Sequence, residues 1–258
     1  MNLGIAGRKA IVCASSRGLG KACARALAEA GCEVVINGRD AKKLEAAASE
    51  LSVAGVKVIP VAADVATADG QKALLAACPQ PDILVNNNAG PPMRDFRELT
   101  RQQMLDGVIA NMVVAIELIQ KVIDPMCQRK FGRIVNITSG SVRMPLAGLD
   151  LSSGARAGLT AFLAGVARKV ADKNVTINNI LPGAFDTDRL RSTLSKSAEQ
   201  QGKSMDEVAA NRIAGIPAKR FGNPDEFGAA CAFLCSTHAG YITGQNLLID
   251  GGNFNGAF

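Results

Sequence analysis

The sequence has few aromatic residues and no pattern of a metal site or a disulfide framework. Its 258 residues include no Trp, one Tyr and one His, and the seven Cys form no CxxC pair. We therefore expect buried, reduced thiols and no bound metal. No apolar run reaches the ~18 residues of a membrane span, and no secretory signal is present. These absences predict a cytoplasmic protein that does not enter membranes.

Charge is dispersed along the chain. Lys and Arg number 29 against 23 Asp and Glu, which gives a net charge of +6 without any basic run. A nucleic-acid groove with stacking aromatic residues is therefore not favoured. An anionic cofactor or substrate explains the excess better, and an acidic protein partner is the alternative.

Short apolar runs alternate with longer amphipathic segments, without a repeat or a linker. The pattern predicts strands at 9–13, 33–37, 56–61, 82–86, 133–138, 175–181 and 246–249, and helices at 18–30, 41–53, 100–129 and 152–169. Strands that are apolar throughout indicate a parallel sheet covered on both faces. The prediction is one doubly wound α/β domain of the Rossmann type over residues 1–258.

Residues 186–216 interrupt this alternation with a polar, charged stretch rich in Ser, Gln and Lys. A connection this long usually has a function of its own. Because it follows a late strand, at the carboxyl edge of the sheet, we expect a substrate lid. The alternative is a solvated helix pair that touches no ligand.

The turn between the first predicted strand and helix, within AIVCASSRGLG at residues 10–20, is rich in Ser and Gly. Unpaired amides and the dipole at a helix N-terminus favour an anion, and glycines allow its close approach. We therefore expect a dinucleotide pyrophosphate here. The expected contacts are Ser16, Arg17, Gly18, Leu19 and Gly20.

The second predicted strand ends in VVINGRD, where dinucleotide-binding folds recognise a ribose. An acidic residue would favour NAD, but this position is Asn37, followed by Gly38 and Arg39. Arg39 and Arg17 suit a 2′-phosphate. The predicted cofactor is NADP(H), and the alternative is two solvated surface arginines.

With these features the chain resembles the short-chain dehydrogenase/reductase family over nearly its whole length. Its pattern is closest to 3-oxoacyl-(acyl-carrier-protein) reductases. The family motif TGxxxGxG corresponds to Cys13, Ala14, Gly18 and Gly20, and Ala14 is compatible with it if its φ stays negative. The C-terminal segment resembles the family's, which implies a homo-oligomer, either a dimer or a tetramer. The resemblance assigns further cofactor contacts to Asp64, Val65, Asn87, Asn88, Ala89, Gly90, Pro182, Gly183 and Thr187.

The resemblance also locates the active site and its departures from the family. Ser139 matches the catalytic Ser, and Asn111 matches the helix Asn that holds a relay water. The family's Tyr and Lys are replaced by Ser152 and Arg156, which share one helix face. Arg156 can donate to the cofactor's ribose, but its ordinary pKa above ~12 rules out an acid role near neutral pH. General acid catalysis is worth ~10²–10⁴-fold, so its loss slows hydride transfer without preventing it.

The resemblance therefore implies an NADP(H)-dependent oxidoreductase that interconverts a ketone, such as a 3-oxoacyl group, and a secondary alcohol. Ser139, Ser152 and Arg156 would polarise the carbonyl, and Asp150 is a speculative acid. One alternative is a cofactor-binding sensor or scaffold that has lost its chemistry. Another is a non-redox isomerase, cyclase or dehydratase. An acyl-carrier protein would dock on basic residues, and the alternative is that these only complement helix ends. The candidates are Arg129, Lys130, Arg168 and Lys169.

Overall fold

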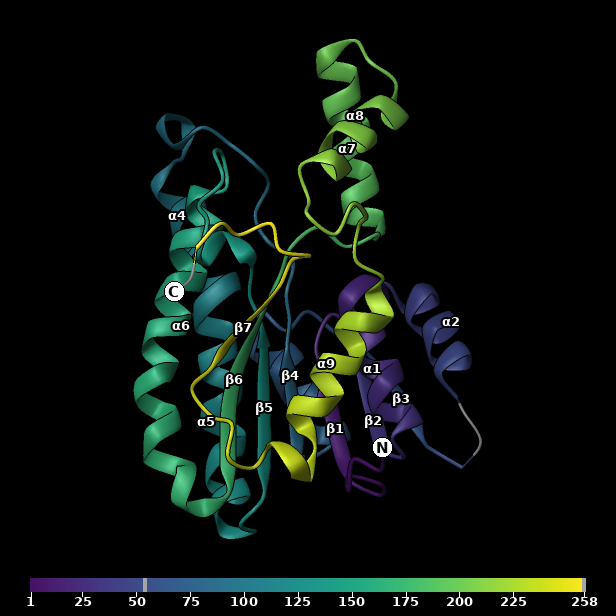
Figure 1. The fold of residues 1–258 in the computed structure, drawn as a ribbon. Coiled ribbons are helices and arrows are strands. Elements are labelled where there is room, and N and C mark those ends of the chain that lie inside the picture. Colours follow the sequence, from purple (N-terminus) through teal and green to yellow (C-terminus); the bar gives the residue numbers. More distant parts are fainter. Residues whose placement is uncertain (53–54, 257–258) are drawn as a thin grey trace.

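The computed structural model describes residues 1–52 and 55–256, which form one parallel sheet of seven strands. The strand order is β3-β2-β1-β4-β5-β6-β7, so the chain reverses direction across the sheet between β1 and β4 (Figure 1). This doubly wound arrangement confirms the predicted fold class. The strands are β1 (Lys9–Val12), β2 (Glu33–Gly38), β3 (Val58–Ala62), β4 (Ile83–Asn86), β5 (Gly132–Ile137), β6 (Val175–Pro182) and β7 (Asn246–Ile249).

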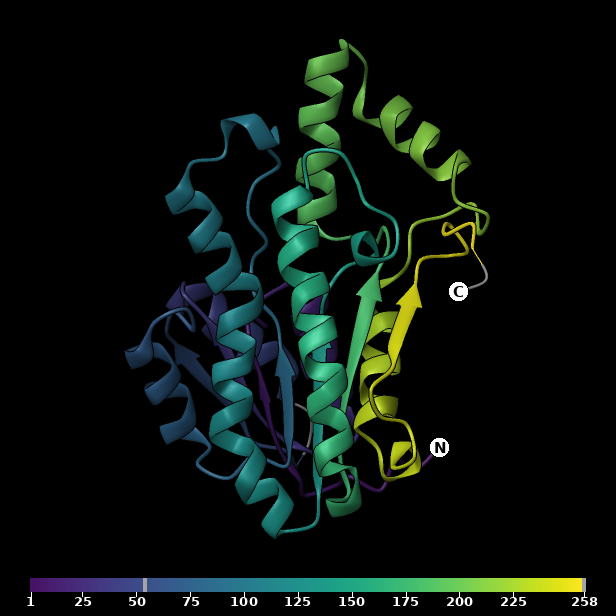
Figure 2. The ribbon, with the colours of Figure 1, turned by 90° about the vertical axis from the view of Figure 1, so that its left-hand side faces the viewer.

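Helices cover both faces of the sheet (Figures 1 and 2). One layer contains α1 (Gly18–Glu29), α2 (Ala41–Leu51) and α9 (Pro224–Cys235). The other contains α3 (Ala68–Ala77), α4 (Arg101–Val108), α5 (Val114–Gln128) and α6 (Asp150–Val170). Successive strand residues pack into opposite layers: Ala10 and Val12 join the core with α1 and α9, whereas Ile11 joins the core with α5 and α6. Burial on both faces explains why the strands are apolar throughout.

Three details differ from the sequence predictions. Helix α3 was not predicted. The expected helix over 100–129 is wrong as one continuous helix, because a π-helical turn at Ile109–Val113 separates α4 from α5. The expected second helix ends at Leu51, and its predicted end at Val53 lies outside the described residues.

Residues 186–216 form a helix pair, α7 (Asp188–Gln201) and α8 (Met205–Ala214), beyond the carboxyl ends of the strands (Figures 1 and 2). The pair has a small core of its own, made by Leu190, Leu194, Ala198 and Val208. The expected place at the carboxyl edge is confirmed, and the use of the pair as a substrate lid stays a prediction.

Candidate active site

The turn between β1 and α1 has the backbone of an anion site. Helix α1 begins at Gly18, and Arg17 at its N-cap provides no side-chain cap, so the first amides face outward. Gly18 has φ +58° and Ala14 has φ +45°. The condition set for Ala14 in the family motif, a negative φ, is therefore not met. The left-handed region costs a non-glycine residue about 1–2 kcal/mol. The turn keeps this conformation at Ala14 although the family has a glycine there.

Gly20 allows this turn to pack closely against the segment that follows β4. A Cβ atom at Gly20 would lie 2.4 Å from the carbonyl oxygen of Ala14 and 2.9 Å from Nδ2 of Asn87. The same Nδ2 donates to the Ala14 carbonyl at 3.2 Å. Only glycine allows this approach, so the turn and the Asn87 segment hold each other in place.

The prediction that Asn37 faces the ribose is wrong. Asn37 is 1% exposed, and its Nδ2 donates to the carbonyls of Val61 and Ala63 at 3.1 and 3.0 Å. Its Oδ1 accepts from the Ala14 amide at 3.3 Å. Asn37 therefore ties β2 to β3 and to the turn, because a buried amide needs all its partners within the protein.

The two predicted phosphate-binding arginines are both exposed at this end of the sheet. Arg39 lies beside Asp64, with 3.8 Å between Nη1 and Oδ2, and three-quarters of its side chain is exposed. Such a loose, exposed pair contributes little, so the Arg39 guanidinium can turn to a phosphate. Arg17 extends from the neighbouring turn.

Other predicted contacts differ in what they can offer a cofactor. Val65 is buried in the core on one face of the sheet, and Leu19 packs against the core on the other face, so these two offer backbone rather than side-chain contacts. Thr187 caps α7 by accepting from the Leu190 amide, and its methyl group lies near Gly18. Thr187 thereby places the start of the helix pair against the phosphate turn, with Pro182 and Gly183 leading from β6.

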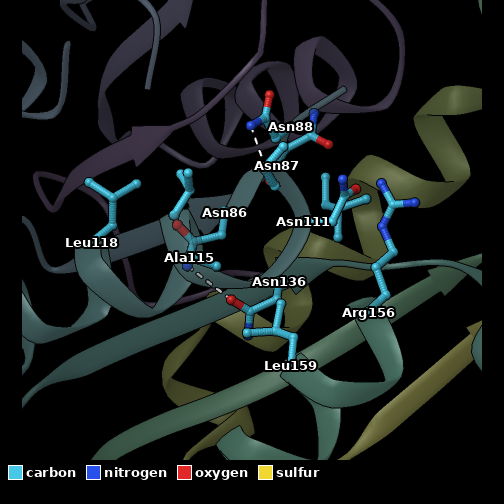
Figure 3. Close-up of a pocket in the computed structure, with 12 residues that line it drawn as sticks. Asn86, Asn87, Asn88, Asn111, Ala115, Leu118, Asn136, Arg156 and Leu159 are labelled. Atoms are coloured by element: carbon cyan, nitrogen blue, oxygen red, sulfur yellow. Dashed lines mark hydrogen bonds between the residues drawn. The ribbon is translucent and has the colours of Figure 1, made fainter. Parts of the chain in front are cut away.

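Asparagines from β4, the segment that follows it, β5 and the π-helical turn line a pocket at the carboxyl ends of β4 and β5 (Figure 3). Nδ2 of Asn88 donates to the Ala110 carbonyl at 3.1 Å, and its Oδ1 accepts from the Ala89 amide. Asn111 lies inside the π-helical turn, a distortion frequent at functional sites. Its Nδ2 donates to Gly107, but its buried Oδ1 has no partner among the described residues. An unpaired buried acceptor of this kind fits a bound water.

Ser139 follows β5 at the same edge and is partly exposed. Its Oγ accepts from both the amide and the hydroxyl of Ser141, at 3.1 and 2.9 Å. Because its acceptor positions are taken, the Ser139 hydroxyl hydrogen is available to donate to another group.

Ser152 and Arg156 are hydrogen-bonded to each other, but their side chains differ in exposure to solvent. Nη1 of Arg156 donates to Oγ of Ser152, which is 2% exposed, whereas Arg156 is partly exposed and lines the pocket. The expectation that both face a substrate is therefore wrong for Ser152, whose hydroxyl is buried against Arg156 and does not line the pocket. Burial, and then the nearby Arg189 charge, lower the pKa of Arg156 to about 10. Arg156 is still cationic at neutral pH.

Arg189 is a site residue that sequence reasoning missed. It lies in the first turn of α7, and its guanidinium approaches Gly90 together with that of Arg156. The sequence placed it only within a polar stretch, and no motif distinguishes it from neighbouring arginines.

The four proposed docking residues lie away from this crevice within one chain. Arg129 and Lys130 precede β5, and Arg168 and Lys169 end α6, so all four lie at the amino edge of the sheet (Figure 1). Arg129 donates to the Pro81 carbonyl at 2.8 Å, just before β4. The expectation that these four basic residues border the active-site crevice of their own chain is therefore wrong. Helices that connect parallel strands end at the amino edge of the sheet, whereas the crevice lies at the carboxyl edge.

Three further observations concern the thiols, metal-binding groups and helices of the chain. Burial raises the pKa of the Cys13 thiol to about 12, so it is not a ready nucleophile. Over residues 1–52 and 55–256, no three His, Cys, Asp or Glu side chains gather as a metal site. Within the same residues, no helix has the length and apolarity to cross a membrane.

Comparisons with known proteins agree over almost the whole chain. A family model described as enoyl-(acyl carrier protein) reductase matches residues 13–253. The NADPH-dependent reductase BacG of Bacillus subtilis is 30% identical, over 95% of this chain and 97% of that protein. The 3-oxoacyl-(acyl-carrier-protein) reductase FabG of Vibrio cholerae is 31% identical, over 98% and 99%.

Solved structures give the same result for the fold. The L-sorbose reductase of Gluconobacter frateurii, complexed with NADPH and L-sorbose, has a TM-score of 0.94 and 28% identity over the full length of both chains. YwfH, an NADPH-dependent reductase involved in bacilysin biosynthesis, has a TM-score of 0.92 and 29% identity, over 98% of this chain and all of that one.

Proposed function

Because the chain belongs to the short-chain dehydrogenase/reductase family, we propose that it reduces a carbonyl compound through Ser139 and Arg156, with Ser152 holding Arg156 in place. It is an NADP(H)-dependent oxidoreductase, as are relatives that cover nearly its full length. The observation on which the proposal depends is the position of Arg156. Its guanidinium lines the pocket beside Asn111 at the carboxyl edge, where the family's Tyr and Lys would be (Figure 3).

The residues present fit NADP(H). The uncapped start of α1 offers amides to the pyrophosphate, and Arg17 and Arg39 are exposed for the 2′-phosphate. Arg156 would donate to the nicotinamide ribose. Bound NADPH would supply the hydride that reduces the carbonyl carbon, leaving NADP⁺.

The chain's own groups act on the carbonyl oxygen. Ser139 has its acceptor positions filled by Ser141, so its hydroxyl donates to that oxygen. Arg156 places positive charge near the alkoxide that forms as the C=O bond is reduced. Ser152 accepts from Nη1 of Arg156 and fixes the orientation of the guanidinium. The proton that completes the alcohol comes from solvent, and the unpaired Oδ1 of Asn111 offers a water a place in that path.

The substrate class proposed is a ketone, and 3-oxoacyl groups are among the candidates. A 3-oxoacyl-(acyl-carrier-protein) reductase and an acetoacetyl-CoA reductase are among the relatives, at 31% and 32% identity. The α7–α8 pair would close over the substrate as a lid, since it stands at the carboxyl edge with its own core.

The test is NADPH oxidation by the wild-type protein with a panel of 3-oxoacyl thioesters, 2-oxo and 3-oxo acids and simple ketones. We expect one secondary alcohol per NADP⁺ formed. Tight NADPH binding without oxidation on the whole panel would favour a sensor or scaffold. A product of unchanged oxidation state would favour an isomerase, cyclase or dehydratase.

We also propose a homo-oligomer. Apolar side chains on α4, the π-helical turn and α6 are exposed, and α4 packs against α6. Exposed apolar patches of this kind mark interaction surfaces. The residues are Met104, Leu105, Ile109 and Phe162. Light scattering is expected to give a mass of at least two chains, and a monomer would contradict the assignment.

A further inference from the structure

Arg156 and Arg189 bring two guanidinium groups to one point of the crevice. A Cβ atom built on Gly90 would lie 3.3 Å from Nη1 of Arg156 and 3.0 Å from Nη2 of Arg189. The two arginines come from different elements, α6 and the first turn of α7, so their convergence is a property of the fold rather than of one helix. Gly90 has no side chain, which leaves room for both groups.

No carboxylate neutralises this pair within the described part of the chain. Neither guanidinium lies within 4 Å of an Asp or Glu oxygen there, although Arg191, two residues further along α7, pairs with Asp186 at 2.9 Å. The like charges disfavour each other: burial first, and then the Arg189 charge, lower the pKa of Arg156. Two like charges in a partly buried crevice are unfavourable unless an anion joins them.

We propose that Arg156 and Arg189 bind a carboxylate of the substrate, so that the physiological substrate is an oxo acid rather than a neutral ketone. This inference rests on the proposed function, because it uses the same crevice. Planar guanidinium groups match a carboxylate in a bidentate manner and favour it over a neutral carbonyl group. Arg156 also lines the pocket that contains Asn111, which places the carboxylate next to the reacting carbonyl.

A cofactor phosphate is the competing occupant. The uncapped amides at the start of α1 already suit the pyrophosphate. Arg17, at the N-cap of α1, and Arg39, directly after β2, are exposed for the 2′-phosphate. The Arg156–Arg189 pair faces Gly90, after β4. The positions of the other anion-binding groups therefore favour the substrate.

The test is equilibrium binding of acetoacetate and 2-oxobutanoate, each beside its methyl ester, to the full-length protein saturated with NADP⁺. No hydride is available in this complex, so binding is measured without turnover. We expect the wild type to bind at least one acid about 10–100-fold more tightly than its ester, which is the range for charge-assisted hydrogen bonds. Arg189→Met should abolish that preference, and Arg189→Lys should restore part of it.

Arg191→Met is the matched control, because it removes an exposed guanidinium from the same helix and should leave the preference unchanged. Equal binding of acid and ester by the wild type, or no binding of either acid, would overturn the proposal. Loss of NADP⁺ affinity in Arg189→Met would assign Arg189 to the cofactor and overturn it as well. Acid-selective binding in a protein that never oxidises NADPH would keep this inference and remove the proposed function.

Discussion

Replacing Gly20 by alanine is expected to weaken NADPH binding at least about 100-fold, as measured by the fluorescence of the bound cofactor. The added Cβ would lie 2.4 Å from the Ala14 carbonyl oxygen, a backbone atom that moves only if the turn moves. Displacing the turn removes amide contacts to the pyrophosphate. Hydrogen bonds to charged groups are worth about 1.5–3 kcal/mol each, so losing two suffices for this effect.

The control for this variant is Gly165→Ala. Gly165 is exposed in α6, and a Cβ there would meet nothing within 4 Å. We expect unchanged NADPH affinity and a gain of up to about 1 kcal/mol in the free energy of unfolding, because alanine favours a helix. NADPH affinity in Gly20→Ala equal to that of the wild type would contradict the cofactor site described above.

Arg156→Met is expected to lower kcat by about 10²–10³-fold at saturating NADPH and ketone. This is the usual cost of removing one donor that stabilises a developing oxyanion. Arg156→Lys should retain part of the activity, because an ammonium keeps the charge but loses the planar fork that bonds Ser152. Ser152→Ala should be milder than Arg156→Met, since Ser152 is buried and acts by orienting Arg156.

These variants separate a positioning role from direct contact with substrate. If Ser152 only orients Arg156, the kcat of the Ser152→Ala, Arg156→Met double variant should equal that of Arg156→Met alone. A kcat for Arg156→Met within about twofold of wild type would contradict the assignment of Arg156. A Ser152→Ala loss that adds fully to the Arg156→Met loss would contradict the positioning role.

Most of the fold could be predicted from the sequence because its signals are local. The apolar runs gave strand positions to within about two residues, and the Ser/Gly-rich turn located the start of α1. The π-helical turn could not be predicted, since a single added residue in a helical turn hardly changes the apolar period. Asp150, suggested above as a speculative acid, lies in the first turn of α6. Its carboxylate complements the helix dipole there.

The site was less predictable because it depends on which side chains meet in space. Asn37 lies at the motif position for ribose recognition, yet its side-chain amide makes hydrogen bonds with three backbone groups of the protein. Arg189 becomes a site residue only because α7 begins close to Gly90. Arg133 shows the same limit in the core. It is 1% exposed with its guanidinium satisfied by carbonyls of Gly132, Asn174 and Ser236, and its sequence position gave no sign of this.

The most direct test of the central claim is the transfer of deuterium from NADPH labelled at C4 of the nicotinamide. Both C4-labelled forms are needed, because either hydrogen can be the one transferred. The account predicts that one of them gives a secondary alcohol with deuterium on the former carbonyl carbon and that transfer falls in Arg156→Met. A product without deuterium from either form, or no product while NADPH binds tightly, would contradict it.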